Sequence, residues 1–217
     1  MLAYPVDIAR DLIESAITLL VILNPIGAIP FFQSLTATAT ADQKKIVAKR
    51  AIVVTSLVLL LFAYLGDAIL AALHITLNSV MIAGGIFILV FAVKDAASHE
   101  SKAKSSECAS SLSTEEASSI AVFPIAIPLL AGPGAIAAVI LLNDPRYGVA
   151  KGITDISTAL AILIDCIIVW LLFAACNRLT RIVKPSAMLI IGKVMDILMG
   201  AIGVSFIVGG ITAILAP

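Results

Sequence analysis

The chain has 217 residues, of which 61% are hydrophobic and 13% are charged, and its formal net charge is zero. Together with a mean hydropathy of +1.13, these values lie far from the averages of soluble domains and predict an integral membrane protein. The balanced charge argues against the basic surface that nucleic-acid binding requires, so no nucleic-acid partner is expected.

Six apolar segments are predicted to cross the membrane as α-helices, because each is close to or above the ~18 residues that a spanning helix needs. The third is the shortest and takes part of its length from residues 74–78. The N-terminal segment lacks the basic start and the cleavage site of a signal peptide, so it is expected to be a retained span. The predicted spans are residues 8–33, 51–73, 77–93, 120–142, 153–175 and 187–215.

The basic residues predict the orientation of these spans. Cytoplasmic loops retain an excess of Lys and Arg, and ten of the 14 basic residues fall in or beside the first, third and fifth connections. The other side has only Arg10, Arg146 and Lys151. We therefore expect a multi-pass protein of the cell (inner or plasma) membrane with both termini outside. The ten residues are Lys44, Lys45, Lys49, Arg50, Lys94, Lys102, Lys104, Arg178, Arg181 and Lys184.

Two groups of three spans must have opposite orientations, so any internal repeat is an inverted one. The stretch NPIGAI (residues 24–29) resembles GPGAI (132–136), although PIGAIP (25–30) also matches PIAIP (124–128), and the sequence leaves the register open. The fold class predicted is therefore all-α integral membrane, as two inverted three-helix repeats in residues 1–93 and 120–217. The Ser-rich residues 94–119 are predicted to form a cytoplasmic linker. This linker is interpreted as a simple tether between the halves, and the alternative is that it binds a regulatory partner.

Proline and glycine are predicted to break the first and fourth helices. Pro25 and Pro30 lack an N–H and should leave the carbonyls of Val21 and Ile26 without helical donors. Asn24 is a favoured N-cap and Pro25 a favoured first helical residue, and Gly132-Pro133-Gly134 resembles this pattern. Irregular backbone at membrane depth survives where it lines a cavity.

If the two new helix starts meet near the bilayer centre, their N–H groups and dipoles favour a carboxylate, while freed carbonyls accept hydrogen bonds from an ammonium group. This predicts a site for a small amino acid. The alternative is that these residues provide only kinks and close packing. The candidate substrate-binding residues are Asn24, Pro25, Ile26, Gly27, Gly132, Pro133 and Gly134.

Four charged residues within the spans are candidates for ion or proton coupling, because each costs about 2.5 to 3.5 kcal/mol at a helix centre unless it finds a partner or water. Asp165 and Asp196 are predicted at similar depth and suggest a proton relay. The alternative is a structural ion pair between Lys193 and Asp196, with Asp165 capped by a hydroxyl. Glu14 lies near the outer end of the first span. It is expected either to take part in gating or proton binding, or to be a simple carboxylate at the membrane interface.

A family resemblance follows from three stretches of this sequence. NPIGAIPFF (residues 24–32), IAIPLLAGPGAI (125–136) and MIAGGIFIL (81–89) resemble the MarC family of membrane proteins, which includes a neutral amino-acid transporter. The resemblance implies two inverted three-helix halves. It also implies transport of small neutral amino acids such as glycine or alanine, driven by a proton or sodium gradient.

No enzymatic motif accompanies these features: the sequence has no HExxH, nucleophile elbow, phosphate loop or paired histidines. Its three cysteines form no CxxC pair, so neither a metal nor another cofactor is expected. The predicted function is a secondary transporter that meets a small amino acid, a coupling proton or sodium ion, and membrane lipid. The alternatives are a non-transporting assembly or regulatory component, or an exporter of another small solute.

Overall fold

The structure is a computed structural model that describes residues 5–98, 119–144, 151–176 and 185–215. Within these ranges the protein is helical and contains no strand. The elements are α1 (Pro5–Leu23), α2 (Pro25–Leu35), α3 (Ala41–Ala72), α4 (Leu77–Ser98), η1 (Ala121–Leu130), α6 (Pro133–Leu142), α7 (Lys151–Ala174) and α9 (Pro185–Leu215).

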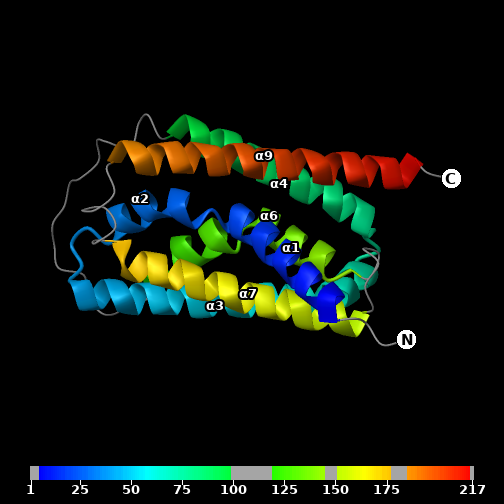
Figure 1. The fold of residues 1–217 in the computed structure, drawn as a ribbon, viewed down its shortest axis with the longest axis horizontal. Coiled ribbons are helices and arrows are strands. Elements are labelled where there is room, and N and C mark those ends of the chain that lie inside the picture. Colours follow the sequence, from blue (N-terminus) through cyan, green and yellow to red (C-terminus); the bar gives the residue numbers. More distant parts are fainter. Residues whose placement is uncertain (1–4, 99–118, 145–150, 177–184, 216–217) are drawn as a thin grey trace.

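These elements form three layers (Figure 1). Helix α4 packs on α9 in one outer layer, α3 packs on α7 in the other, and the broken segments α1, α2, η1 and α6 lie between them. Each layer combines elements from both predicted halves, and α4 and α9, like α3 and α7, run in opposite directions. An inverted repeat would produce such pairs, although the repeat itself stays a prediction.

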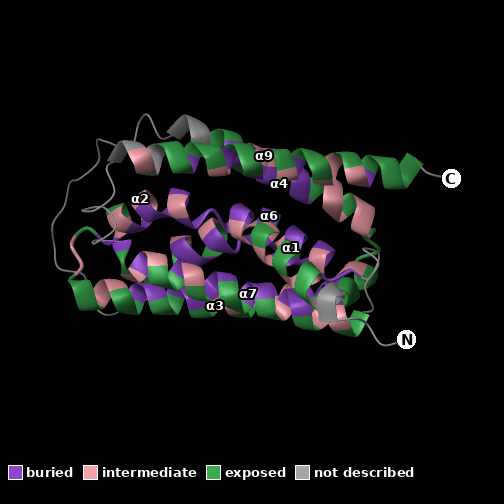
Figure 2. Cartoon of the chain, viewed as in Figure 1, coloured by how far each residue is buried: buried purple, intermediate pink, exposed green. Residues whose placement is uncertain are grey.

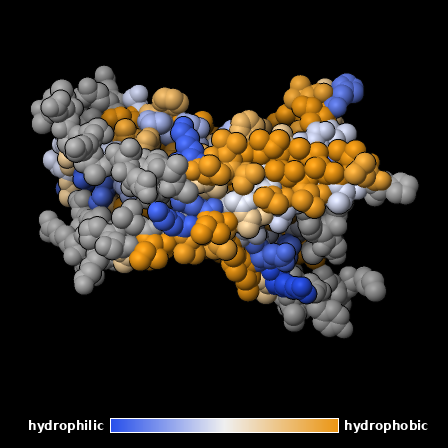
Figure 3. All heavy atoms as spheres, turned by 90° about the horizontal axis from the view of Figure 1, so that it is seen from above, coloured by the Kyte–Doolittle hydropathy of each residue, from blue (hydrophilic) through white to orange (hydrophobic). Residues whose placement is uncertain are grey.

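The hydrophobic core is concentrated in the middle layer, where seven of the ten residues of α6 and five of the 11 residues of α2 are buried (Figure 2). Phe32 of α2 and Phe173 of α7 are both fully buried, and their rings stack with centroids 4.5 Å apart. The outer helices instead expose long apolar faces, which give the α4 and α9 side a broad hydrophobic surface (Figure 3). Exposed apolar residues on such long helices face the acyl chains of a bilayer.

Six membrane spans are confirmed when the pair formed by η1 and α6, bent by 57°, is counted as one span. The largest difference from the predicted boundaries is in α3, which begins at Ala41 instead of residue 51. Thr40 and Gln43 form a capping box that starts this helix early, so Lys49 and Arg50 lie on the helix and not in a loop. With 32 residues, α3 is about 48 Å long and extends beyond a hydrocarbon core of about 30 Å.

The third span also continues past its predicted end at Val93, because α4 remains helical to Ser98. Lys94 is therefore part of this helix, whereas the sequence places it in the linker. The rest of the Ser-rich linker lies outside the described residues. The starts of α3, η1 and α9 lie at one end of the molecule, and the start of α1 and the end of α9 lie at the other (Figure 1). Which end is cytoplasmic remains a prediction.

Asn143 joins three helices at the end of the molecule where α6 stops. Its side-chain nitrogen donates to the Ala63 carbonyl of α3 at 2.8 Å and to the Asp155 carboxylate of α7 at 3.0 Å. The nearby ion pair between Lys151 and Asp67 is 3.2 Å long, and both side chains are about half exposed. The interior bonds therefore contribute more to stability than the surface pair does.

Asn143→Ala is expected to lower the free energy of unfolding by about 1 to 2 kcal/mol, since two interior hydrogen bonds are lost. Asp67→Asn is the matched control, because an exposed ion pair contributes about 0 to 1 kcal/mol. Thermal melts of the purified variants in detergent measure both effects. Equal destabilisation by Asn143→Ala and Asp67→Asn would contradict the conclusion that the hydrogen bonds of Asn143 contribute more to stability than the surface ion pair.

Candidate functional site

The break in the first span is built around Asn24, which ends one helix and starts the next. Its backbone is left-handed (φ 41°, ψ 57°), and its N–H donates to the carbonyls of Leu20 and Val21 at 3.1 and 3.2 Å. Its side-chain Oδ1 then accepts from the N–H of Gly27, at 3.2 Å, and caps α2. Asparagine suits both roles, because it tolerates the left-handed conformation better than most residues and is a strong N-cap.

This geometry confirms the predicted cap at Asn24 and the predicted helix start at Pro25. It also corrects one expectation. The Val21 carbonyl was predicted to lack a donor, but the left-handed turn at Asn24 directs its own N–H back onto that carbonyl.

The remaining part of the Asn24 side chain binds a carboxylate from a distant helix. Its Nδ2 donates to Oδ1 of Asp196 on α9 at 2.9 Å, and the two residues are both 2% exposed. Asn24 thus links the break in the first span to the sixth span. The sequence marked both residues as candidates but gave no sign that they meet, because they are 172 residues apart.

The second break is longer and involves both η1 and the start of α6. Phe123 and Ile127, each followed by a proline, have extended backbones (φ −132°, ψ 122° and φ −128°, ψ 123°), as steric clash with a following proline favours. Helix α6 then begins at Pro133 with Gly132 as N-cap, as predicted, and no side chain of the described residues caps its first turn. The N–H groups of that turn remain available to a ligand.

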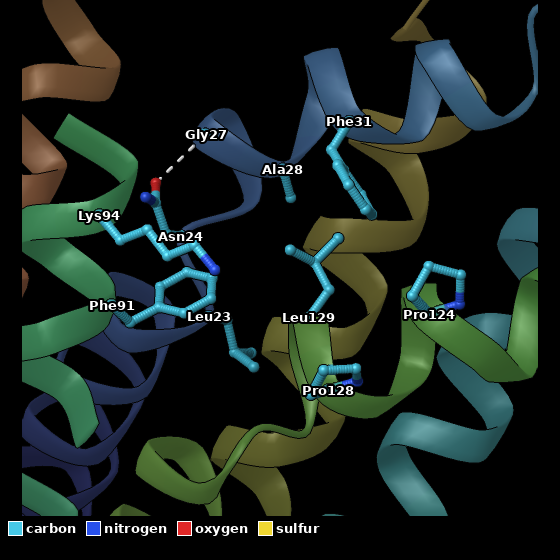
Figure 4. A pocket seen from close by; sticks show the side chains of 10 residues that line it. All are labelled: Leu23, Asn24, Gly27, Ala28, Phe31, Phe91, Lys94, Pro124, Pro128 and Leu129. Atoms are coloured by element: carbon cyan, nitrogen blue, oxygen red, sulfur yellow. Dashed lines mark hydrogen bonds between the residues drawn. The ribbon is translucent and has the colours of Figure 1, made fainter. Parts of the chain in front are cut away.

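The two breaks line adjoining cavities. The first cavity, of about 280 Å³, is lined by Asn24 and Gly27 together with Pro124 and Pro128 of η1 (Figure 4). The second cavity, of about 270 Å³, is lined by Gly132, Pro133 and Gly134. Residues that line both cavities are Phe91, Lys94, Pro128 and Leu129. Residues of both interruptions therefore line adjoining cavities that share four residues, whereas the meeting of the two helix starts near the bilayer centre stays a prediction.

The walls of these cavities are mostly apolar, with polar groups at a few positions. The side chain of Lys94 extends from α4 toward Asn24, beside the ring of Phe91 (Figure 4). Sequence reasoning missed Lys94, because the apolar run ends at Val93 and the lysine was assigned to a loop. The available signal was the spacing of Phe91 and Lys94, which are three residues apart and would be neighbours on one face if the helix continued past Val93.

The other predicted site residues divide into those near the cavities and those elsewhere. Pro25 is buried beside Asn24, and Ile26 is half-buried, yet neither lines a cavity. Glu14 is exposed on α1. Asp165 is 1% exposed on α7, and within the described residues neither of its carboxylate oxygens has a hydrogen-bond partner, so the predicted hydroxyl cap is absent.

The predicted ion pair between Lys193 and Asp196 is wrong within the described part of the chain. Lys193 is exposed, while Asp196 points inward and accepts a hydrogen bond from Asn24. Residues three apart on a helix are neighbours, but here packing turns one toward the core and the other toward the outside.

The sequence matches the model of the family described as MarC family integral membrane protein over residues 9–215. The chain belongs to the MarC family. It is 33% identical to UPF0056 membrane protein YhcE of Escherichia coli strain K12, over 91% of this chain and 90% of that one. It is also 33% identical to UPF0056 membrane protein MJ0972 of Methanocaldococcus jannaschii, over 96% and 90% of the two chains.

A further MarC relative, UPF0056 membrane protein YvbG of Bacillus subtilis, is 34% identical over 61% of this chain and 63% of its own. The names of these relatives state that they are membrane proteins and give no substrate. No solved structure matches the chain significantly. The family membership therefore establishes an integral multi-pass membrane protein, and the solute must be argued from the cavities.

Proposed function

We propose that this MarC protein is a secondary transporter of small neutral amino acids of the glycine or alanine type, driven by a proton or sodium gradient. The observation that carries the proposal is that two broken helices line adjoining cavities with mostly apolar walls. Discontinuous helices at such positions are the usual binding elements of secondary transporters.

The polar groups of the cavities suit a zwitterion. The uncapped start of α6 and the ammonium group of Lys94 attract a carboxylate, while carbonyls freed by Pro124 and Pro128 in η1 accept hydrogen bonds from an ammonium group. A cavity of about 280 Å³ lies just below the usual range of ligand pockets and favours a small solute. The apolar walls exclude side chains that carry a second charge.

Purified protein in liposomes tests this function directly. With an imposed proton or sodium gradient, labelled glycine or alanine should accumulate above the level of protein-free liposomes. Absence of uptake of either solute under both gradients would favour the alternatives, a non-transporting component or an exporter of another solute. Uptake that survives replacement of Asn24 and of Gly132, Pro133 and Gly134 would show that the solute binds elsewhere.

Lys94→Met is expected to weaken binding of glycine or alanine by about tenfold, the effect of losing roughly 1.4 kcal/mol of interaction with the carboxylate. A thermal-shift titration measures the change, because a ligand that binds only the folded state raises its stability by mass action. Lys193→Met is the matched control, since Lys193 is an exposed lysine that lines neither cavity. Equal affinity for wild type and Lys94→Met would exclude Lys94 from the site.

A further inference from the structure

Two further buried polar side chains, one on α7 and one on α3, lie outside the linings of both cavities. Asp165 of α7 and Thr55 of α3 are each 1% exposed. Both carboxylate oxygens of Asp165 and the hydroxyl oxygen of Thr55 lack hydrogen-bond partners among the described residues. Unpartnered buried polar groups in a membrane are costly, and a buried carboxylate is the most costly of them.

The register of the two helices places these groups at the same depth. The Tyr64 hydroxyl of α3 donates to the Asp155 carbonyl of α7 at 3.3 Å, and α3 and α7 run in opposite directions. Nine residues before Tyr64 is Thr55, and nine residues after Asp155 is Ile164, the neighbour of Asp165. Both helices are continuous there and rise by the same 1.5 Å per residue, so the levels coincide.

A series of hydroxyl groups leads along α7 from its N-terminal end toward Asp165. Thr154, Ser157 and Thr158 are at most 1% exposed and occupy the inward face at helical spacing. Ser15 on the inward face of α1 is 2% exposed, and one carboxylate oxygen of Asp11, one turn earlier, is buried without a partner in the described structure. This end of the core is therefore more polar than the rest.

Helix α7 also contacts the substrate cavities indirectly. Phe173, two turns beyond Asp165, stacks on Phe32 of α2, and the Gln33 side chain of α2 donates to the Cys176 carbonyl at 3.4 Å. Since α2 carries Gly27 at the cavity wall, a displacement of α7 is transmitted to the break through these two contacts.

We propose that Asp165, with Thr55 beside it in depth, is the binding site of the coupling proton. This inference rests on the proposed transport function and identifies its coupling ion. The carboxyl group takes up a proton when it is connected to water at one end of the protein and releases it when it is connected to the other. The proton bound to Asp165 neutralises the carboxylate while α7 moves, and no bond other than this O–H forms or breaks.

A proton fits this position better than a sodium ion. A metal cation must replace its hydration shell with several oxygen ligands, and transporters supply many of these from unwound backbone. Here α3 and α7 are unbroken helices, so their backbone carbonyls accept hydrogen bonds within the same helix and are not available to a cation. Among the described residues of α3 and α7, the unpartnered buried oxygens at this depth are the Thr55 hydroxyl and the Asp165 carboxylate, which are too few to replace a hydration shell.

No positive charge on the neighbouring helices points at Asp165 in the described structure. Helices α2 and α6, which pack on α7, contain no titratable residue. On α1 and α3 the cations Arg10, Lys45, Lys49 and Arg50 are exposed, while Lys44 is half-buried near the start of α3. The remaining titratable groups on α1 and α3 are Asp7, Asp11, Glu14, Asp42, Tyr64 and Asp67, and those on α7 besides Asp165 are Lys151, Asp155 and Cys166.

Infrared difference spectroscopy tests the proton site without any substrate. A pH jump on the purified protein in lipid should change a protonated-carboxyl band that disappears in Asp165→Asn and persists in Glu14→Gln, an exposed carboxyl on α1. Thr55→Val should shift the frequency of that band, because it removes the buried hydroxyl at the same depth and makes this level of the core less polar. A band unaffected by Asp165→Asn would overturn the proposal.

Transport provides the second test. In Asp165→Asn, uptake driven by a proton gradient should fall to the level of protein-free liposomes, while exchange of labelled for unlabelled solute continues, since exchange requires no net proton movement. Loss of exchange together with uptake, or uptake that depends on sodium instead, would contradict the assignment. If wild-type protein moves neither glycine nor alanine, the proposed function fails, whereas the infrared result still decides whether Asp165 binds a proton.

Discussion

Asn24→Asp is expected to destabilise the protein by about 3 to 5 kcal/mol and to abolish solute binding, and adding Asp196→Asn is expected to recover most of the loss. The single substitution replaces the donor Nδ2 with a second carboxylate oxygen 2.9 Å from Asp196, inside the core. Two carboxylates at that distance cannot both be ionised. The double substitution exchanges donor and acceptor, so one charge and one hydrogen bond remain, and the cap on Gly27 is kept.

Asn24→Gly separates the role of the side chain from that of the backbone, because glycine adopts the left-handed conformation of Asn24 without strain. It should cost less than Asn24→Asp, since it removes bonds but adds no charge. Thermal melts and solute binding of the wild type, Asn24→Asp, Asp196→Asn and the double variant form a double-mutant cycle, which isolates the coupling between the two positions. Additive effects in this cycle would show that the bond between Asn24 and Asp196 does not matter.

The sequence predicted the break at Asn24 because that break follows local rules. A strong N-cap, a proline at the first helical position and a glycine one turn later act within a few residues of one another. The same rules located the start of α6 at Pro133. The early start of α3 also follows a local rule, the capping box at Thr40. It was not predicted, because the helix boundary was placed at residue 51, where the sequence changes from polar to apolar.

The contacts that assemble the site could not be predicted in this way, because they depend on how the layers pack. Asp196 faces Asn24 and Lys193 faces outward only because α9 turns one face toward the breaks. Lys94 reaches the cavities because α4 continues as a helix beyond the apolar run. For Asp165 the sequence indicated the cost of a buried charge, while the lack of a partner depends on the positions of α1 and α3.

Gly85→Ala and Gly203→Ala are each expected to lower the free energy of unfolding by about 3 kcal/mol, the upper end of the cost of overpacking. These glycines face each other where α4 packs closely on α9. A Cβ on Gly85 would lie 2.5 Å from the Gly203 carbonyl oxygen, and a Cβ on Gly203 would lie 2.8 Å from the Gly85 carbonyl oxygen. Both obstacles are backbone atoms of helices, so the two helices must separate.

Separation of α4 from α9 is expected to affect transport as well, because the two helices carry Lys94 and Asp196. Gly200→Ala is the matched control on α9: its Cβ would meet only the Ala92 and Leu89 side chains, at 3.7 and 3.8 Å, in ordinary contact. It should be neutral or slightly stabilising, since alanine favours a helix over glycine by up to about 1 kcal/mol. Melting temperatures and uptake in liposomes measure both effects. If Gly85→Ala and Gly203→Ala behave like Gly200→Ala, then α4 and α9 tolerate a wider spacing, and their close approach is not required for the site.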